Sequence, residues 1–406
     1  MSRVSAFRAL RPKPEAVARV ASVPYDVVST NEAKVLAHDN PLSALHISRA
    51  EIDLPADTDP YSSAVYEQAA TNFALLKSSA PLIVEEQPSL YIYRLRMGTH
   101  EQIGVAGCYS LDDYDKNVIR KHEHTRREKE DDRTHHMLEL RAQMGPVFLT
   151  YRASTTVDAL VSTVVSTQPP LFDFMAPDQV QHTLWRTEAS QSSSLVAAFE
   201  EVPTLYIADG HHRAASASRV RHHLRDTYSR DGKWDMFLAV AFPDAQVQIL
   251  PYNRVVKDLG PHTRESFLTA LHERGTVRDG NPAEPQAGEV SMYLGDRWYS
   301  VSLETSPSST EPASRLDVSR LHNQILSPLL GIGNAGTDKR VDFIGGVRGL
   351  SELKRLVDSK TVAVAFAMHA VNIGDLLTVS DLGGIMPPKS TWFEPKLRDG
   401  LLFYLI

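Results

Sequence analysis

Six consecutive residues carry the densest polar chemistry in the chain: Ala208-Asp209-Gly210-His211-His212-Arg213. The preceding residues 204–207 have the apolar character of a strand, and the very small residues 214–218 favour a helix. A strand, a glycine turn and a helix start leave backbone N–H groups pointing at an anion, and the helix dipole adds to the attraction. The aspartate could bind a metal ion or accept a hydrogen bond from a hydroxyl group. The arginine could donate a forked pair of hydrogen bonds to phosphate oxygens. The alternative is an ordinary Asp-Gly turn whose histidines cap a helix.

A second candidate is Glu123, which stands between two histidines in Lys121-His122-Glu123-His124-Thr125. We expect a charged helix to begin near Ile119, with Glu123 at its start, where a carboxylate could accept a proton from a substrate hydroxyl. The alternative is a solvated helix face, because Glu123 and Arg127 have the favourable i,i+4 spacing. The segment lacks the second histidine of a His-Glu-x-x-His zinc motif, which disfavours metallopeptidase chemistry.

A third candidate is Lys389-Ser390-Thr391, which follows two prolines. The prolines restrict the backbone, and a cation with two hydroxyls suits phosphate oxygens. No Gly-x-x-x-x-Gly precedes the lysine, so this is not a Walker A motif. The next residues, Trp392 and Phe393, are more typical of core packing. By itself this segment does not identify a reaction.

The elements around these candidates alternate between strands and helices, which predicts an α/β or α+β fold with mixed sheets. A capping box at Ser29–Glu32 starts an early helix, and a second helix opens after Asp59-Pro60. We expect a hairpin from 90–95 and 102–109, strands at 146–151, 182–185, 236–242 and 362–368, a helix at 316–330, and surface loops at 278–288 and 304–314. Three domains are expected: an N-terminal α/β domain (1–110), a core with the glycine turn (111–260), and a C-terminal region that completes the site (261–406).

Composition narrows the classes of protein. The chain has 406 residues, a net charge of −7 and a single cysteine. The acidic balance argues against general nucleic-acid binding, and one cysteine excludes an internal disulfide or a multi-cysteine metal site. There is no secretory signal pattern and no apolar run of about 20 residues, so a cytoplasmic protein without a membrane segment is expected.

The chain resembles, nearly end to end, the bacterial family catalogued as domain of unknown function 1015. The stretches that carry the resemblance are residues 8–12, Pro24-Tyr25-Asp26-Val27, 121–125, 145–149, 208–213, 252–256 and 386–397. Some members of that family look like pyrophosphate-dependent L-serine kinases. The Asp-Gly-His-His-Arg turn is also similar to that of ADP-dependent free serine kinases, which share the ParB/sulfiredoxin-like fold.

The resemblance implies roles for particular residues. In those kinases a Gly-x-x-Arg turn holds the phosphates of the donor, and the matching residues here are Gly210, His211, His212 and Arg213. The resemblance implies that Mg²⁺ bridges these phosphates to Asp209. Its early glutamate corresponds to Glu123 by order along the chain, and its Lys-x-Thr corresponds to Lys389 and Thr391. Trp392-Phe393 depart from the basic residue and histidine that follow in those kinases. The implied catalytic side chains are Glu123, Asp209, His212 and Lys389.

The implied reaction is Mg²⁺-dependent phosphorylation of free L-serine, with pyrophosphate, ADP or ATP as donor. Three alternatives stay open: a ParB-like module that binds nucleotide or DNA, a metal-dependent phosphohydrolase, and a binding protein without catalysis. The acidic net charge and the lack of a helix-turn-helix count against the first. Donor, acceptor and oligomeric state stay open, and a homodimer formed through the first hundred residues is one option.

Overall fold

The computed structural model describes residues 2–280, 284–304 and 311–406, and the chain divides into two compact units. Unit 1 comprises the residues up to Lys121 together with Thr125–Val247 and Pro395–Ile406. Unit 2 comprises His122–His124 and Gln248–Glu394. Each unit is therefore assembled from separate stretches of chain.

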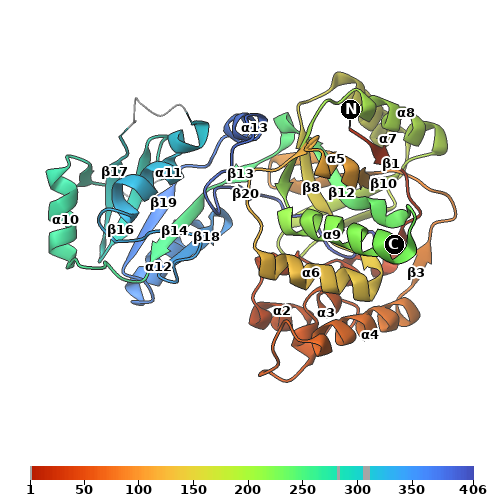
Figure 1. Ribbon diagram of the computed structural model, residues 1–406, viewed down its shortest axis with the longest axis horizontal. Coiled ribbons are helices and arrows are strands. Elements are labelled where there is room, and N and C mark those ends of the chain that lie inside the picture. Colours follow the sequence, from red (N-terminus) through yellow and green to blue (C-terminus); the bar gives the residue numbers. More distant parts are fainter. Residues whose placement is uncertain (1, 281–283, 305–310) are drawn as a thin grey trace. The chain divides into compact units, whose positions relative to one another are not determined.

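Unit 1 is built on a mixed sheet (Figure 1). Among the described residues its strand order is β6 (Ile119–Arg120), β11 (Leu205–Asp209), β8 (Val147–Tyr151), β12 (Met236–Pro243), β5 (His100–Ser110), β4 (Tyr91–Met97), β10 (Val180–Arg186) and β9 (Phe172–Met175), and β1 (Val4–Ser5) also pairs with β5. The pairs β6–β11 and β8–β12 are parallel, and the other pairs are antiparallel. The central strand β12 is buried along nearly all its length, which explains its continuous apolar run Phe237–Pro243.

Helices cover both faces of this sheet. On one side α7 (Thr155–Thr167) packs on β4 and β5 and against α8 (Ala189–Glu200). On the other side α9 (His211–Tyr228) packs on β8 and β12, α6 (Arg127–Leu140) packs on α9, and α4 (Ser63–Ser79) packs on α6. Figure 1 shows α9, α6 and α4 as successive layers. The shorter helices of unit 1 are α1 (Pro14–Val20), α2 (Thr30–Ala37), α3 (Leu45–Ser48) and α5 (Leu111–Asp115).

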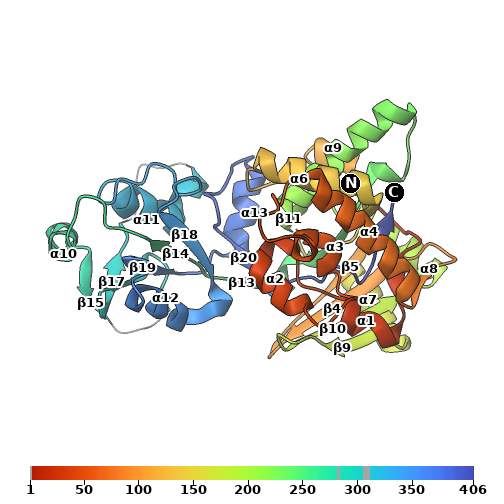
Figure 2. The ribbon, with the colours of Figure 1, turned by 90° about the horizontal axis from the view of Figure 1, so that it is seen from below.

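Unit 2 has an antiparallel sheet with the order β15 (Val277–Asp279), β17 (Arg297–Ser302), β16 (Glu289–Leu294), β19 (Val364–Met368), β14 (Tyr252–Val256) and β18 (Val341–Gly345). Helix α12 (Gly349–Asp358) packs on β16 and β19, and both views show it alongside the sheet (Figures 1 and 2). A two-stranded pair joins β13 (Ile249–Leu250) to β20 (Trp392–Phe393). The remaining helices are α10 (Arg264–Glu273), α11 (Asp317–Leu321) with a π-helical turn (His322–Leu326), and α13 (Ile373–Asp381).

Most predicted elements are present, and the mixed α/β class is confirmed. The hairpin is β4–β5, and Ser29 and Glu32 form the predicted capping box. The predicted loop 278–288 begins inside strand β15, and residues 281–283 of it lie outside the described residues, as do residues 305–310 of the second predicted loop. The predicted helix 316–330 is shorter, because its regular turns end at Leu326.

Two predictions need correction. The charged helix does not begin near Ile119: residues 119–120 form strand β6, which pairs in parallel with β11, and α6 begins at Arg127. Glu123 therefore precedes the helix and does not lie on it. The domain boundary expected at residue 110 falls inside a continuous sheet. Strand β5, which ends at Ser110, pairs directly with β12, which lies in the next expected domain.

No helix among the described residues is both long enough and apolar enough to cross a membrane.

Candidate functional site

The turn between β11 and α9 has the predicted strand–glycine–helix geometry. Gly210 is the N-cap of α9 and has a φ of 97° and a ψ of 29°, a left-handed conformation that favours glycine. Within the described chain, no side chain caps this helix start. A Cβ on Gly210 would stand 3.0 Å from Nε of Arg213, so the arginine folds back directly beneath the turn. The turn therefore needs glycine for its backbone and for the guanidinium under it.

Arg213 lies inside the protein, where carboxylates surround it. Its side chain is 6% exposed, and Nη1 donates to the carbonyl oxygen of Pro146. Its Nη2 lies 3.6 Å from Asp209 Oδ2 and 4.0 Å from Asp26 Oδ2. Burial lowers the pKa of Arg213, but the charges of Asp26, Asp209 and Asp399 outweigh burial and raise it, so the guanidinium stays charged.

Asp399 is the most deeply buried carboxylate of this cluster. It is 2% exposed, and its Oδ1 has no hydrogen-bond partner among the described residues. Burial raises its pKa to about 7, although Arg213 opposes the shift. Backbone hydrogen bonds in both directions with Ser22 hold the segment, and a Cβ on Gly145 would come within 2.7 Å of Oδ1. Asp399 is thus enclosed from two sides.

A cavity of about 40 Å³ lies within this cluster. Its polar lining includes Tyr25, Arg133, His136, Arg213 and Asp399. Burial, followed by the nearby Arg133, lowers the pKa of His136 to about 3, and its Nε2 lies 2.9 Å from the carbonyl oxygen of Ile47. The histidine is therefore neutral at physiological pH and serves as a hydrogen-bonding group.

Asp209 is shared between two cations. Lys396 Nζ lies 3.2 Å from Asp209 Oδ2, the same oxygen that Arg213 approaches. The Asp209 side chain is 27% exposed and that of Lys396 is 11% exposed, so the pair is more accessible than Arg213. Asp209 therefore forms an ion pair with each of the two cations.

The two histidines of the turn occupy different surroundings. His211 is buried, whereas His212 is half-buried and its Nε2 accepts a hydrogen bond of 3.0 Å from the backbone N–H of Arg126. An imidazole nitrogen that accepts carries no proton, so this network assigns the proton of neutral His212 to Nδ1. The bond ties the turn to the residue that precedes α6.

The other predicted residues, Glu123, Lys389 and Thr391, belong to unit 2. Met386 N donates to the carbonyl oxygen of His122 over 2.8 Å, so a backbone hydrogen bond joins a residue just before Glu123 to one shortly before Lys389. Lys389 has a φ of 59°, and its Nζ lies 5.8 Å from the ring centre of Tyr252.

The backbone of the Lys389 segment is anchored from within unit 2. Arg254 Nη2 donates to the carbonyl oxygen of Lys389 over 3.1 Å, and Ser390 Oγ donates to that of Pro387 over 2.6 Å. Burial lowers the pKa of Arg254 to about 10. Trp392 was expected to pack in the core, but its indole also makes a polar contact: Nε1 donates to Glu394 Oε2 over 2.8 Å.

The sequence analysis assigned no role to Asp26, Lys396 or Asp399. Asp26 and Lys396 lie in stretches that carry the family resemblance, Pro24-Tyr25-Asp26-Val27 and 386–397, and this was the available signal. Asp399 lies two residues beyond the second stretch and had no signal of its own. Because these residues are far from the turn in sequence, only the folded chain brings them to Arg213 and Asp209.

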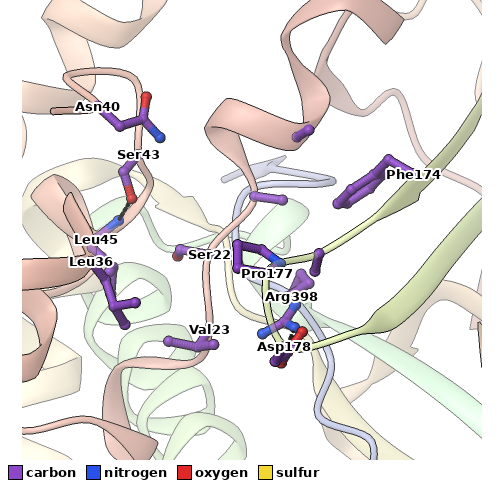
Figure 3. Close-up of a pocket in the computed structure, with 13 residues that line it drawn as sticks. Ser22, Val23, Leu36, Asn40, Ser43, Leu45, Phe174, Pro177, Asp178 and Arg398 are labelled. Atoms are coloured by element: carbon purple, nitrogen blue, oxygen red, sulfur yellow. Dashed lines mark hydrogen bonds and ion pairs between the residues drawn. The ribbon is translucent and has the colours of Figure 1, made fainter. Parts of the chain in front are cut away.

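Unit 1 also has a pocket of about 400 Å³ (Figure 3). Its walls are mostly apolar, with Val23, Leu36, Leu45, Phe174 and Pro177 among the lining residues. Arg398 and Asp178 form its charged edge: Arg398 Nη2 pairs with Asp178, and Nε donates to His182 Nε2 over 3.0 Å. The neighbouring residue, Asp399, lines the small cavity of the Arg213 cluster instead.

The fold and the turn define a mixed α/β protein with a candidate anion-binding helix start. The chain belongs to the family described as "Protein of unknown function (DUF1015)", whose model matches residues 4–319. A comparison with curated proteins finds no match.

Three solved structures illustrate the distant likenesses. A conserved hypothetical protein from Pyrococcus furiosus has 14% sequence identity and a TM-score of 0.35, over 74% of this chain and 94% of that one. A variant of free serine kinase in complex with ADP has 14% identity and a TM-score of 0.36, over 74% and 92%. C-terminally truncated SbnI from Staphylococcus aureus has 11% identity and a TM-score of 0.35, over 72% and 85%. With TM-scores below 0.5, these likenesses assign no activity to this chain.

Proposed function

We propose that this protein is a phosphotransferase that moves a phosphoryl group from pyrophosphate or a nucleotide to the hydroxyl of free L-serine. The observation that carries the proposal is the turn at Gly210, where β11 ends at a half-buried aspartate and a long helix starts with no side-chain cap from the described residues. Such a helix start attracts phosphate oxygens through its N–H groups and its dipole. The resemblance of residues 208–213 to the turn of free serine kinases supports L-serine as the acceptor.

Magnesium fits the donor chemistry of the turn. Oxygens of Asp209 and Asp26 both lie within 4.0 Å of Arg213 Nη2, and Mg²⁺ prefers carboxylate and phosphate oxygens. We propose Asp209 as the protein ligand of a bound Mg²⁺, which would neutralise charge on the donor. Because Arg213 and Lys396 already balance Asp209, the metal fits best together with an anionic phosphate donor.

The proposed step is an in-line displacement at the terminal phosphorus. Glu123 accepts the proton of the serine hydroxyl as its oxygen attacks, and the bond from phosphorus to the leaving oxygen breaks. With pyrophosphate the products are O-phosphoserine and orthophosphate. Residues 210–213 act on the donor, and Lys389 and Thr391 neutralise or position the group in transfer.

Phosphorus NMR tests this proposal directly. The protein is incubated with Mg²⁺ and L-serine in three tubes that contain pyrophosphate, ADP or ATP. We expect a phosphomonoester signal that matches O-phosphoserine, and the tube in which it grows identifies the donor. Orthophosphate that grows equally with and without serine would indicate a hydrolase, and unchanged spectra in every tube would favour a binding module.

The role of Glu123 is tested by Glu123→Gln, with Glu128→Gln as a control on an exposed residue of the same charged run. Loss of a general base lowers turnover by roughly 10²- to 10⁴-fold. We expect that loss only for Glu123→Gln, measured as the rate of phosphoserine formation. Equal rates for the two variants would remove Glu123 from the reaction.

A further inference from the structure

We propose that Lys396 is the cationic side chain that meets a bound phosphate, and that Arg213 is a positioning residue that holds Asp209 from beneath the turn. The inference rests on the proposed function and deepens it. It reverses the roles suggested by the sequence pattern, in which Arg213 contacts the donor and Lys396 has no part.

The surroundings of Arg213 are those of an internal anchor. Its guanidinium is enclosed under Gly210, donates to Pro146, and lies between Asp209 and Asp26. To reach a ligand, it would have to move away from Asp26 and from the carbonyl oxygen of Pro146, and Asp209 would keep only Lys396 as a counter-charge. Uncompensated buried charge is strongly unfavourable, so the arginine is expected to stay in place when a ligand binds.

Lys396 is placed differently. Its ammonium group reaches Asp209, whose side chain is 27% exposed, at the end of a flexible four-carbon chain. Its backbone is anchored by neighbours, because Leu397 is 3% exposed and Arg398 is held by Asp178 and His182. Because Asp209 directly precedes the Gly210 turn, an anion bound at the helix start would lie next to the carboxylate that Nζ contacts.

The charges near the turn favour the same assignment. A phosphate that approaches α9 meets the negative charge of Asp209, which opposes binding. Arg213 is already neutralised by Asp26 and Asp209 together. Lys396 can instead contact both the carboxylate and the anion, and a charge-assisted hydrogen bond from an ammonium group is among the strong ones.

The test measures binding of inorganic pyrophosphate, with Mg²⁺ present, by isothermal titration calorimetry. The variants are Lys396→Met, Lys396→Arg, Arg213→Lys and Arg213→Gln, and exposed Lys116→Met is the control. We expect Lys396→Met to weaken binding about 10- to 100-fold, Lys396→Arg to restore part of the affinity, and Lys116→Met to leave it unchanged. Arg213→Lys is expected to keep the affinity within about threefold while thermal stability and turnover fall.

A second readout does not depend on turnover. Lysines are labelled by reductive ¹³C-methylation, and the Lys396 signal is identified by its absence in Lys396→Arg. We expect this signal to shift when pyrophosphate binds to the wild-type protein, and to shift without ligand in Arg213→Gln because Asp209 has moved. If Arg213→Gln does not fold, the binding result for Arg213→Lys decides its role.

The outcomes separate this inference from the proposed function. Pyrophosphate binding that depends on Lys396 in a protein that forms no phosphoserine would support the inference and reject the kinase. Unchanged affinity in Lys396→Met, or a wild-type protein that does not bind pyrophosphate, would overturn the assignment of Lys396. A loss of affinity in a stably folded Arg213→Lys equal to that in Lys396→Met would return the phosphate role to Arg213.

Discussion

Three carboxyl groups, those of Asp26, Asp209 and Asp399, lie around the Arg213 guanidinium beneath the turn. Asp209 and Asp26 lie near Arg213 at 3.6 and 4.0 Å, and they balance its charge. The pKa of Asp399 is raised to about 7 by burial, so this carboxyl group is largely protonated below neutral pH. A third full negative charge is thereby avoided in a space that water reaches poorly.

Asp399→Asn should change how stability depends on pH. The folded-state pKa of about 7 lies above the ordinary carboxyl value of 3.8, so between these values the folded protein holds a proton that the unfolded chain has released. The contribution of Asp399 to stability is therefore complete below pH 4 and is lost as pH rises to about 7. Asparagine stays neutral, so we expect the variant to gain about 4 kcal/mol relative to wild type between pH 4 and pH 8.

Urea denaturation at several pH values measures this difference. Asp57→Asn, at an exposed position of the same unit, is the control and should follow the wild-type curve. Parallel curves for wild type and Asp399→Asn would show that the buried carboxyl group does not titrate in this range.

At the scale of elements, the β11–α9 turn combines a backbone requirement with a packing requirement. Strand β11 is held by β8 on one side and β6 on the other, so the position of Asp209 is set by the sheet. Helix α9 packs on β8 and β12, and its small residues Ala214 and Ala217 are buried there. The packing of the sheet and of α9 therefore sets the direction of the helix start, and Gly210 connects the strand to the helix.

Gly210→Ala should destabilise unit 1 by about 2 kcal/mol, because an L-residue at this φ is strained and its Cβ would contact Arg213 at 3.0 Å. The matched control is Gly98→Ala in the β4–β5 hairpin, where φ is also positive, at 58°, and nothing lies within 4 Å of the new Cβ. Urea denaturation of both variants separates the contribution of strain, which they share, from that of the Arg213 contact. An equal loss of unfolding free energy in the two variants would show that the Arg213 side chain moves away from the new Cβ without destabilising the protein.

At the scale of the whole molecule, the C-terminal residues complete the unit in which the chain begins. Strand β21 (Tyr404–Leu405) pairs with β7 (Ala142–Gln143), and Phe403 forms a backbone bridge with Leu10. The Phe403 ring is stacked on Phe73 of α4 with a centroid distance of 5.4 Å. Because Lys396 and Asp399 lie in this same closing segment, closure of the fold also places the charged residues of the site.

Phe403→Ala should therefore destabilise unit 1 by about 3–5 kcal/mol, the usual cost of removing a fully buried aromatic ring. Leu75→Ala on the same helix as Phe73 is the control, because Leu75 is 58% exposed and should cost less than about 0.5 kcal/mol. Urea unfolding followed by circular dichroism measures both. A small loss for Phe403→Ala would mean that the closing segment docks without contributing to the core.

Sequence patterns were enough to predict the mixed α/β class, the hairpin, most strands and the strand–glycine–helix turn at Gly210. These features depend on local patterns: apolar runs, capping residues and a glycine at a left-handed position, all of which act over a few residues. The family resemblance was likewise visible in short motifs, and the family model that covers residues 4–319 confirms it.

The extent of unit 1 and the charges around the turn could not be predicted from the sequence, because both depend on contacts between distant parts of the chain. The sheet continues past residue 110 because β5 pairs with β12, and the segment before α6 becomes strand β6 because β11 lies beside it. Asp26, Lys396 and Asp399 come to Arg213 and Asp209 from both ends of the chain, and no local pattern encodes such pairing. Long-range strand pairing and charge burial depend on the whole fold, so they are invisible in any short stretch of sequence.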